Sequence, residues 1–300
     1  PGFYHWMVVE QVWRTMFTAE AGPAVAFFAL CLTIPETPRF LARAGKEERA
    51  MDVLVRIGGR VSAEKQMGEI RQVLAQEEGR MRELLQPGFR KALFVALFLS
   101  VVSEMSGVTV VLYYGSKMLS GAGVAFASAL GGFALVGLVN MAFTVFAIWL
   151  MDRAGRRPLL GLGTLGCCIA LTLLGLLFVT GNSSGVPIIA LICLFMACFA
   201  FSIGPIKWVM MSEIFPTKIR GRAVAIATLA VWATDWVYNQ AYPVVTQDML
   251  FKVVSQQTGT GIVFFFFAAV LVPQLFFVWK VMPETRNKTL EEIEQDWIRG

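Results

Sequence analysis

Three ionisable side chains lie inside long apolar runs, where they are the residues best placed to do chemistry. Glu104, Lys207 and Asp235 each interrupt a stretch of aliphatic and aromatic residues. A charged group at the centre of a bilayer costs about 2.5–3.5 kcal/mol even on lenient insertion scales, so such residues indicate a functional site. Glu104 and Lys207 carry opposite charges and are predicted to pair, or Glu104 is predicted to bind the hydroxyl groups of a solute.

Each of these three residues also has a structural interpretation. Lys207 lies five residues before Ser212, where its apolar run ends, so its ammonium could snorkel to the interface. Glu104 could stay protonated against a neighbouring helix. Asp235 could form a hydrogen bond between helices.

Neutral polar and aromatic residues accompany the charges. The polar ones are Ser103, Thr109, Asn140 and Asn239. Gly204 and Pro205 can break a helix and bring backbone groups to a cavity, and Trp208 follows them. Hydroxyl-binding groups beside an aromatic face are what a polyhydroxylated solute needs. This pattern therefore favours a binding site over packing alone.

Composition places these residues in a membrane protein. Of 300 residues, 56% are hydrophobic and 16% are charged, where a soluble protein usually has about 25% charged residues. The net charge of +5 forms no patch typical of nucleic-acid binding. With one histidine and five cysteines in apolar runs, the sequence predicts no metal site and no cofactor. It contains no nucleophile–base pair and no phosphate loop, so we expect no enzyme.

Seven runs are long enough for transmembrane helices, so the predicted fold is an all-α membrane protein. The runs are residues 12–34, 92–114, 126–151, 159–180, 186–211, 223–245 and 261–281. Most Lys and Arg residues lie in alternate connections, which indicates that these connections and the C-terminus are cytoplasmic. An external N-terminus without a leader peptide favours further helices upstream of Pro1.

A polar segment, residues 41–86, separates the first run from the second. Met51, Leu54, Val55 and Ile57 are predicted on one helical face, and Met67, Ile70, Val73 and Leu74 on another. Gly58 and Gly59 between the two stretches favour a helix end. We expect two or three amphipathic cytoplasmic helices, with a solvated linker as the alternative.

Several motifs in a fixed order resemble the sugar porter branch of the major facilitator superfamily, and bacterial xylose–proton symporters in particular. They are WRTMF at 13–17, PETPR at 35–39, Gly107 with Tyr113 and Tyr114, DRAGRR at 152–157, GPIKW at 204–208, SEIFP at 212–216, Arg220 with Gly221, and PETR at 283–286. PETPR and PETR also follow the first and last runs, which hints at an internal repeat.

The resemblance implies that the runs are helices six to twelve of a twelve-helix carrier, with the first five absent. Residues 1–34 would be an external segment and the last helix of the N-terminal bundle. Residues 35–91 would be the cytoplasmic helical domain, 92–282 the C-terminal six-helix bundle, and 283–300 a cytoplasmic tail. The missing N-terminal bundle would then be needed for a complete pathway.

The resemblance also implies site residues. The expected substrate-binding residues are Ser103, Glu104, Thr109, Tyr113, Asn140, Gly204, Lys207, Trp208, Trp232 and Asp235. Sugar porters usually have amides at the positions of Ser103, Glu104 and Thr109, and the bacterial symporters have glutamine at Val231. The architecture is therefore expected to be that of a carrier, while an ordinary hexose or xylose is an open question.

A second set of charges is expected to form a cytoplasmic gate. Its members are Glu36, Arg39, Asp152, Arg156, Arg157, Glu213 and Arg220. By resemblance they hold the cytoplasmic helix ends together and separate as the inside opens. The alternative is that Arg153, Arg156 and Arg157 only fix topology through the positive-inside bias.

The expected function is transport of a sugar or related polyol by alternating access in a bacterial inner membrane. Protons are an optional partner, because the coupling residues of the family lie largely in the absent half. One alternative is a carrier of the same fold for a charged or non-sugar solute. Another is a membrane sugar sensor that does not transport.

Overall fold

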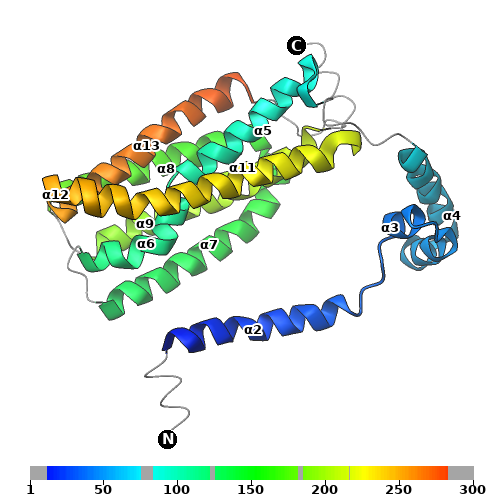
Figure 1. Cartoon of the computed structure of the whole chain (residues 1–300), viewed down its shortest axis with the longest axis horizontal. Helices are drawn as coiled ribbons and strands as arrows, with labels where there is room; N and C mark the ends of the chain where they lie inside the picture. The colour runs from blue at the N-terminus through cyan, green and yellow to red at the C-terminus, as the bar shows by residue number, and fades with distance from the viewer. Residues whose placement is uncertain (1–11, 76–83, 122–125, 182–184, 216, 283–300) are drawn as a thin grey trace, which may run out of the picture. The chain divides into compact units, whose positions relative to one another are not determined.

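Helices are the only regular secondary structure in the part of the chain that the structure describes. The computed structural model describes residues 12–75, 84–121, 126–181, 185–215 and 217–282. Contacts divide the chain into two compact units, Pro1–Glu77 and Glu78–Gly300, and most of their helices are labelled in Figure 1. The expected external segment at 1–11 and the expected tail at 283–300 lie outside the described residues.

The structure describes three helices in the first unit. They are α2 (Val12–Cys31), α3 (Pro38–Arg43) and α4 (Glu47–Ala75). The Thr37 side chain caps α3 by accepting a hydrogen bond from the backbone N–H of Phe40 at 3.4 Å. Gly59, with φ of 76°, divides α4 at the glycine pair that the sequence indicates as a helix end.

The core of this unit follows the predicted periodicity only in part. Leu54, Met67 and Ile70 are buried, as expected for amphipathic helices. The expectation for Val55 and Ile57 is wrong, because they are 38% and 72% exposed. The buried face of the first half of α4 instead runs through Ala50 and Leu54, four residues apart. Alanine side chains are small and contribute little to a hydrophobicity pattern, so the pattern predicted the wrong buried face for this half of the helix.

An exposed ion pair joins the two halves of α4. Arg71 Nη2 donates to Glu47 Oε2 at 2.6 Å, and this hydrogen bond and charge lower the pKa of the Glu47 carboxyl. Because the pKa of the Glu47 carboxyl is lower in the folded state than in the unfolded state, the pair stabilises the folded unit at pH values above the unfolded-state pKa. This contribution is lost as the pH falls through the lower, folded pKa.

We therefore expect α4 to become slightly more susceptible to protease as the pH falls from neutral towards 3. In Arg71→Gln this pH dependence should be weaker, because the carboxyl then titrates near its ordinary pKa. The control is Arg60→Gln, which removes a more exposed cation from the local Arg60–Glu64 pair. Identical pH profiles for the parent and Arg71→Gln would contradict the prediction.

The second unit contains the other helices that the structure describes. They are α5 (Pro87–Met105), α6 (Val108–Gly121), α7 (Phe126–Ala154), α8 (Arg156–Val179), α9 (Gly185–Phe201), α10 (Ile203–Glu213), α11 (Thr217–Pro243), the π-helix η3 (Val244–Leu250), α12 (Phe251–Val253) and α13 (Gln256–Lys280). Two expected spans are each broken in two. Gly107, with φ of 85°, separates α5 from α6, and Ser202 separates α9 from α10. Both breaks lie next to residues of the expected site.

Five helical segments of the described residues are long and apolar enough to cross a membrane. They are Phe89–Met118, Ala134–Met151, Arg156–Val179, Gly185–Glu213 and Gln256–Lys280. The other two expected spans are also helical. In α2 the apolar part is short, Glu20–Cys31. α11 begins with cations and carries Asp235, Asn239 and Gln240, which lowers its hydropathy, yet it packs against α5.

Close helix packing explains several glycines of this bundle. α8 packs against α13 and α9, and α7 packs against α9. A Cβ at Gly163 would lie 1.7 Å from Ser202 Oγ, so only glycine allows α8 to approach this break so closely.

On α13, Phe264 and Phe267 are buried, whereas Phe266 and Trp279 are exposed.

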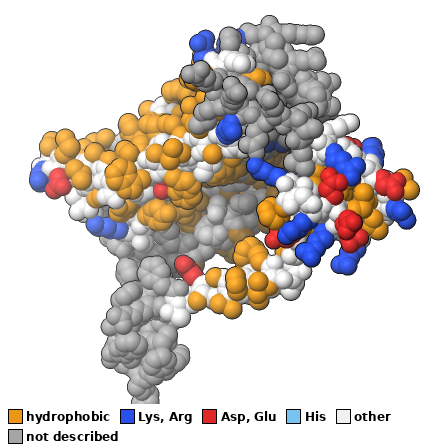
Figure 2. Space-filling model, turned by 45° about the vertical axis from the view of Figure 1, so that its right-hand side comes forward, with side chains coloured by type: hydrophobic (Ala, Val, Ile, Leu, Met, Phe, Trp, Pro, Cys, Tyr) orange, Lys and Arg blue, Asp and Glu red, His pale blue; other side chains and the backbone are white. Residues whose placement is uncertain are grey.

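The surface separates apolar from charged regions. Figure 2 shows apolar side chains over the visible face of the long helices, and charged side chains of both signs gathered on α4. Exposed apolar residues on the helices that qualify as membrane spans include Ile148, Leu162 and Phe276, each more than 60% exposed. Such a band is typical of a lipid-facing surface. The second unit therefore has the architecture of a membrane bundle.

Candidate functional site

A buried polar cluster joins α5 to α10. Glu104 and Lys207 are only 4% and 7% exposed, and Ser103 is 1% exposed. Lys207 Nζ donates to Glu104 Oε1 and, at 3.1 Å, to Ser103 Oγ. Ser103 Oγ also lies 3.3 Å from Glu104 Oε1. The structure thus pairs the two charges, and the alternative that Lys207 snorkels to the interface is wrong.

The helix break at Ser202 positions Lys207 for this contact. The Ser202 hydroxyl donates to the Cys198 carbonyl at 2.6 Å, and α10 starts at the next residue. Lys207 then lies in the second turn of α10, opposite the end of α5. Because the two charges neutralise each other and share a hydroxyl, the cluster avoids the cost of an isolated buried ion.

One carboxylate oxygen of the cluster is available to a ligand. Lys207 and Ser103 both contact Oε1 of Glu104. No hydrogen bond to Glu104 Oε2 occurs among the described residues. A carboxylate oxygen accepts strong hydrogen bonds from hydroxyl groups. The cluster can therefore bind a hydroxyl without breaking its own ion pair.

Aromatic side chains lie beside the cluster and on other helices. Lys207 Nζ is 5.3 Å from the centre of the Trp208 ring, which is a cation–π contact. Trp208 is 41% exposed, Trp232 on α11 is 62% exposed, and Tyr113 on α6 is 66% exposed. Exposed rings in an apolar bundle are suited to stacking against the C–H face of a solute.

Thr109 is the second expected site residue with unused hydrogen-bonding capacity. It lies in the first turn of α6, directly after the break at Gly107. Its hydroxyl oxygen is buried and has no hydrogen-bond partner among the described residues. A buried, unpaired hydroxyl costs about 1–3 kcal/mol, so a ligand hydroxyl would relieve this cost.

The remaining expected site residues are not joined to the cluster by any hydrogen bond that the described residues show. Asn140 is half-buried on α7, and Gly204 lies in the first turn of α10. Asp235 is half-buried on α11 and accepts a hydrogen bond from Asn239 Nδ2 at 2.9 Å. That bond is within α11, so the structure does not show Asp235 bonded between helices.

Sequence reasoning missed one contact between α6 and α11. Tyr114 donates its hydroxyl to the Asn239 carbonyl at 3.3 Å, and its ring lies 4.7 Å from that of Tyr242. The sequence feature that could have indicated this contact was the motif containing Tyr113 and Tyr114. Tyr114 is the member of that pair that connects helices, while Tyr113 is exposed.

Among the expected cytoplasmic charges, Arg156, Arg157 and Glu213 make contacts between helices of the second unit. Arg156 Nη2 pairs with Glu213 Oε1 at 2.9 Å and joins α8 to α10. Arg157 Nε donates to the Val278 carbonyl at 3.0 Å, and Nη2 donates to the Trp279 carbonyl. The Arg157 guanidinium thus caps the C-terminal end of α13, a role that the sequence did not reveal.

The other members of the expected gate are placed as follows. Arg220 Nε donates to the Phe215 carbonyl at 3.2 Å. Asp152 lies in the last turn of α7, and its side chain is outside the described part. Glu36 and Arg39 lie in the first unit, at the start of α3. Of the charges expected to form a gate, the described residues of the second unit thus show the Arg156–Glu213 pair and the backbone contacts of Arg157 and Arg220.

Comparison with known proteins identifies the family. Residues 3–297 match the family described as "Sugar (and other) transporter". An arabinose-proton symporter of Bacillus subtilis is 36% identical over 99% of this chain and 62% of its own length. A D-xylose-proton symporter of Escherichia coli is 35% identical over 95% of this chain and 57% of its own length.

Solved structures agree with this match. The proton:xylose symporter XylE bound to 6-bromo-6-deoxy-D-glucose superposes with a TM-score of 0.76 at 34% identity. The match covers 95% of this chain and 59% of that one. An inward-open conformation of XylE from E. coli gives a TM-score of 0.73 at 32% identity.

The chain thus spans 57% to 62% of the length of these curated relatives. The expected helical membrane fold and the expected resemblance are both confirmed. This chain is a multi-pass membrane protein that belongs to the sugar transporter family of the major facilitator superfamily.

Proposed function

We propose that the protein containing this chain transports a neutral sugar or polyol by alternating access. The observation that carries the proposal is the buried Ser103–Glu104–Lys207 cluster beside Trp208. It is neutral overall, and it offers a carboxylate oxygen to a hydroxyl group. Where sugar porters usually have amides, this ion pair supplies a donor and an acceptor in their place.

The charge balance favours a neutral solute over a charged one. A charged solute would be attracted by one member of the Glu104–Lys207 pair and repelled by the other at a similar distance, so in this poorly solvated site the pair gives neither sign of charge a net advantage. A hydroxyl can donate to Glu104 Oε2 and leave the pair intact. The unpaired Thr109 hydroxyl supplies a second contact on α6.

The relatives define the solutes to test first. The names of the two symporters above specify arabinose and D-xylose, and that of a third relative, a Bacillus subtilis protein 29% identical to this chain, specifies myo-inositol. We propose a bacterial inner-membrane location with a cytoplasmic C-terminus. The Arg-rich turn at 153–157 supports this orientation, because such turns are enriched on the cytoplasmic side.

The test is uptake by cells that lack their own sugar carriers and express the complete reading frame. Labelled arabinose, xylose, glucose and myo-inositol would be supplied with and without a protonophore. Saturable uptake of one solute supports the proposal, and its loss with the protonophore identifies proton coupling. If the protein reaches the membrane and none of these solutes enters, a neutral sugar or polyol is the wrong substrate class, or the protein is a sensor.

We further propose that the Arg156–Glu213 pair holds the cytoplasmic ends of α8 and α10 together in the outward-open state. Glu213→Gln should remove a charged hydrogen bond worth about 1.5–3 kcal/mol and raise the inward-open fraction. The measurement is labelling of a cysteine introduced in the cytoplasmic pathway with an impermeant thiol reagent. We expect faster labelling from the cytoplasmic side in Glu213→Gln and in Arg156→Gln.

Arg153→Gln is the matched control for this prediction. Arg153 is exposed, lies over the Trp149 ring at 3.9 Å, and carries the same charge in the same turn. If these arginines only fix topology, Arg153→Gln and Arg156→Gln should behave alike. A gate requires that only Arg156→Gln changes the labelling rate.

A further inference from the structure

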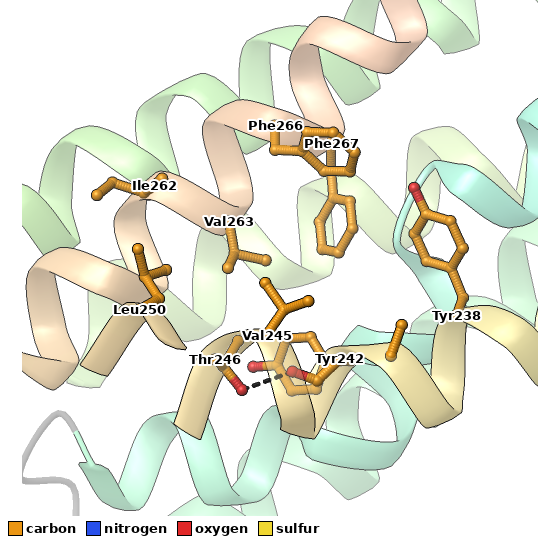
Figure 3. Close-up of a pocket in the computed structure, with 10 residues that line it drawn as sticks. Tyr238, Tyr242, Val245, Thr246, Leu250, Ile262, Val263, Phe266 and Phe267 are labelled. Carbon is orange, nitrogen blue, oxygen red and sulfur yellow. Dashed lines mark hydrogen bonds between the residues drawn. The ribbon is translucent and has the colours of Figure 1, made fainter. Parts of the chain in front are cut away.

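An apolar groove lies between the end of α11 and α13, away from the polar cluster. Its volume is about 400 Å³, and its walls come from α11, η3 and α13. Figure 3 shows Tyr238, Tyr242 and Thr246 on one side, with Val263, Phe266 and Phe267 on the other. Phe267 is buried, whereas Val245, Ile262 and Phe266 are between 40% and 52% exposed. The groove is therefore open at its rim.

The π-helix shapes one wall of this groove. α11 ends at Pro243, and the next seven residues form η3. The Thr246 hydroxyl donates to the Tyr242 carbonyl at 2.7 Å, the bond drawn in Figure 3. This bond satisfies both polar groups locally and leaves apolar side chains to line the groove. π-helical turns are rare and occur frequently at functional sites.

A pocket of about 170 Å³ with a mixed polar and apolar lining, called the polar pocket below, adjoins the groove and shares Tyr242 and Thr246 with it. Its other lining residues include Lys117 on α6 and Gln256 at the start of α13. Lys117 is exposed, and no ion pair of its ammonium is found in the described part of the chain. A polar pocket with one cation thus adjoins an apolar groove.

The spacing along α13 matches one leaflet of a bilayer. Gln256 borders the polar pocket and Phe266 lines the groove ten residues later. Ten helical residues rise about 15 Å, which is half of the roughly 30 Å hydrocarbon core. α13 is one of the five segments apolar enough to span a membrane. The two cavities therefore extend from a membrane interface to about mid-depth.

We propose that these adjoining cavities bind one anionic phospholipid. An acyl chain lies in the groove against Phe266 and Ile262, and the phosphate lies near Lys117 at the interface. The chain gains van der Waals contacts with the apolar walls, and a lysine near the surface attracts anionic headgroups. The site goes beyond the proposed transport function, because it is separate from the Ser103–Glu104–Lys207 cluster and takes a different class of ligand.

The test uses protein from the complete reading frame, purified and reconstituted with phosphatidylglycerol or phosphatidylcholine of the same acyl chains. Native mass spectrometry then counts the retained lipids. We expect one retained phosphatidylglycerol, bound about five-fold more tightly than phosphatidylcholine. Lys117→Gln should abolish this preference, while Lys280→Gln, at the other end of α13, should not.

Filling the groove is the second arm of the test. Ala241 lines the groove, so Ala241→Trp should reduce retention of both lipids at least ten-fold. Ala225→Trp introduces the same ring at an exposed position of α11 outside the groove and should retain lipid. If Ala241→Trp aggregates, the test rests on the lipid headgroup preference of Lys117→Gln compared with that of Lys280→Gln. The proposal is wrong if the parent protein retains no lipid, the result expected if another part of the protein covers the groove. It is also wrong if Lys117→Gln and Lys280→Gln have the same lipid preference.

Discussion

Lys207→Met is expected to destabilise the protein by about 3–5 kcal/mol and to abolish transport. The substitution leaves the Glu104 carboxylate buried at 4% exposure without its cation, and removing one partner of a buried pair is much more costly than removing both. The measurement is the melting temperature of the purified protein, together with solute uptake at equal membrane expression.

The double variant Glu104→Gln/Lys207→Met separates folding from binding. It contains no unpaired charge, so we expect most of the lost stability to return. If the pair also binds solute, uptake should stay impaired although the fold has recovered. Lys280→Met is the control, because Lys280 is an exposed lysine at the end of α13. A Lys207→Met protein as stable as the parent would show that this ion pair is not formed in the membrane.

The sequence predicted the existence of the helices better than their interruptions. The run 186–211 is apolar except for a few residues such as Ser202 and Lys207, so hydropathy alone indicates one continuous span. The break falls at Ser202, two residues before the glycine and proline that favour it. At this position the Ser202 hydroxyl bonds locally to the Cys198 carbonyl, and Gly163 of α8 approaches closely; the second of these is a tertiary feature, which hydropathy does not reveal.

The candidate site shows the same division between local and tertiary information. Opposite charges in two apolar spans made pairing of Glu104 and Lys207 one prediction, because isolated buried charges are costly, but the sequence could not decide between this pair and snorkelling of Lys207. The role of Ser103 as a second acceptor for Lys207 required the geometry. The capping of α13 by Arg157 also could not be predicted, since its acceptors are backbone carbonyls, which every residue carries.

Gly107→Ala is expected to destabilise the protein by about 2–5 kcal/mol. Gly107 has a φ of 85°, a conformation that costs a residue with a Cβ about 1–2 kcal/mol. The added Cβ would also lie 2.3 Å from Cδ2 of Phe267, and overpacking a core costs about 1–3 kcal/mol more. The break between α5 and α6 thus requires glycine for two independent reasons.

These two contributions can be measured separately by thermal denaturation. Gly181 has a φ of 70°, and a Cβ added there would meet nothing within 4 Å, so Gly181→Ala should show the conformational cost alone. The steric cost should appear in a double-mutant cycle, because Phe267→Ala removes the ring that the new methyl group meets. We expect Phe267→Ala to cost less in the Gly107→Ala background than in the parent. Additive effects would mean that α6 shifts away from α13, and that the Gly107–Phe267 contact does not fix the position of α6.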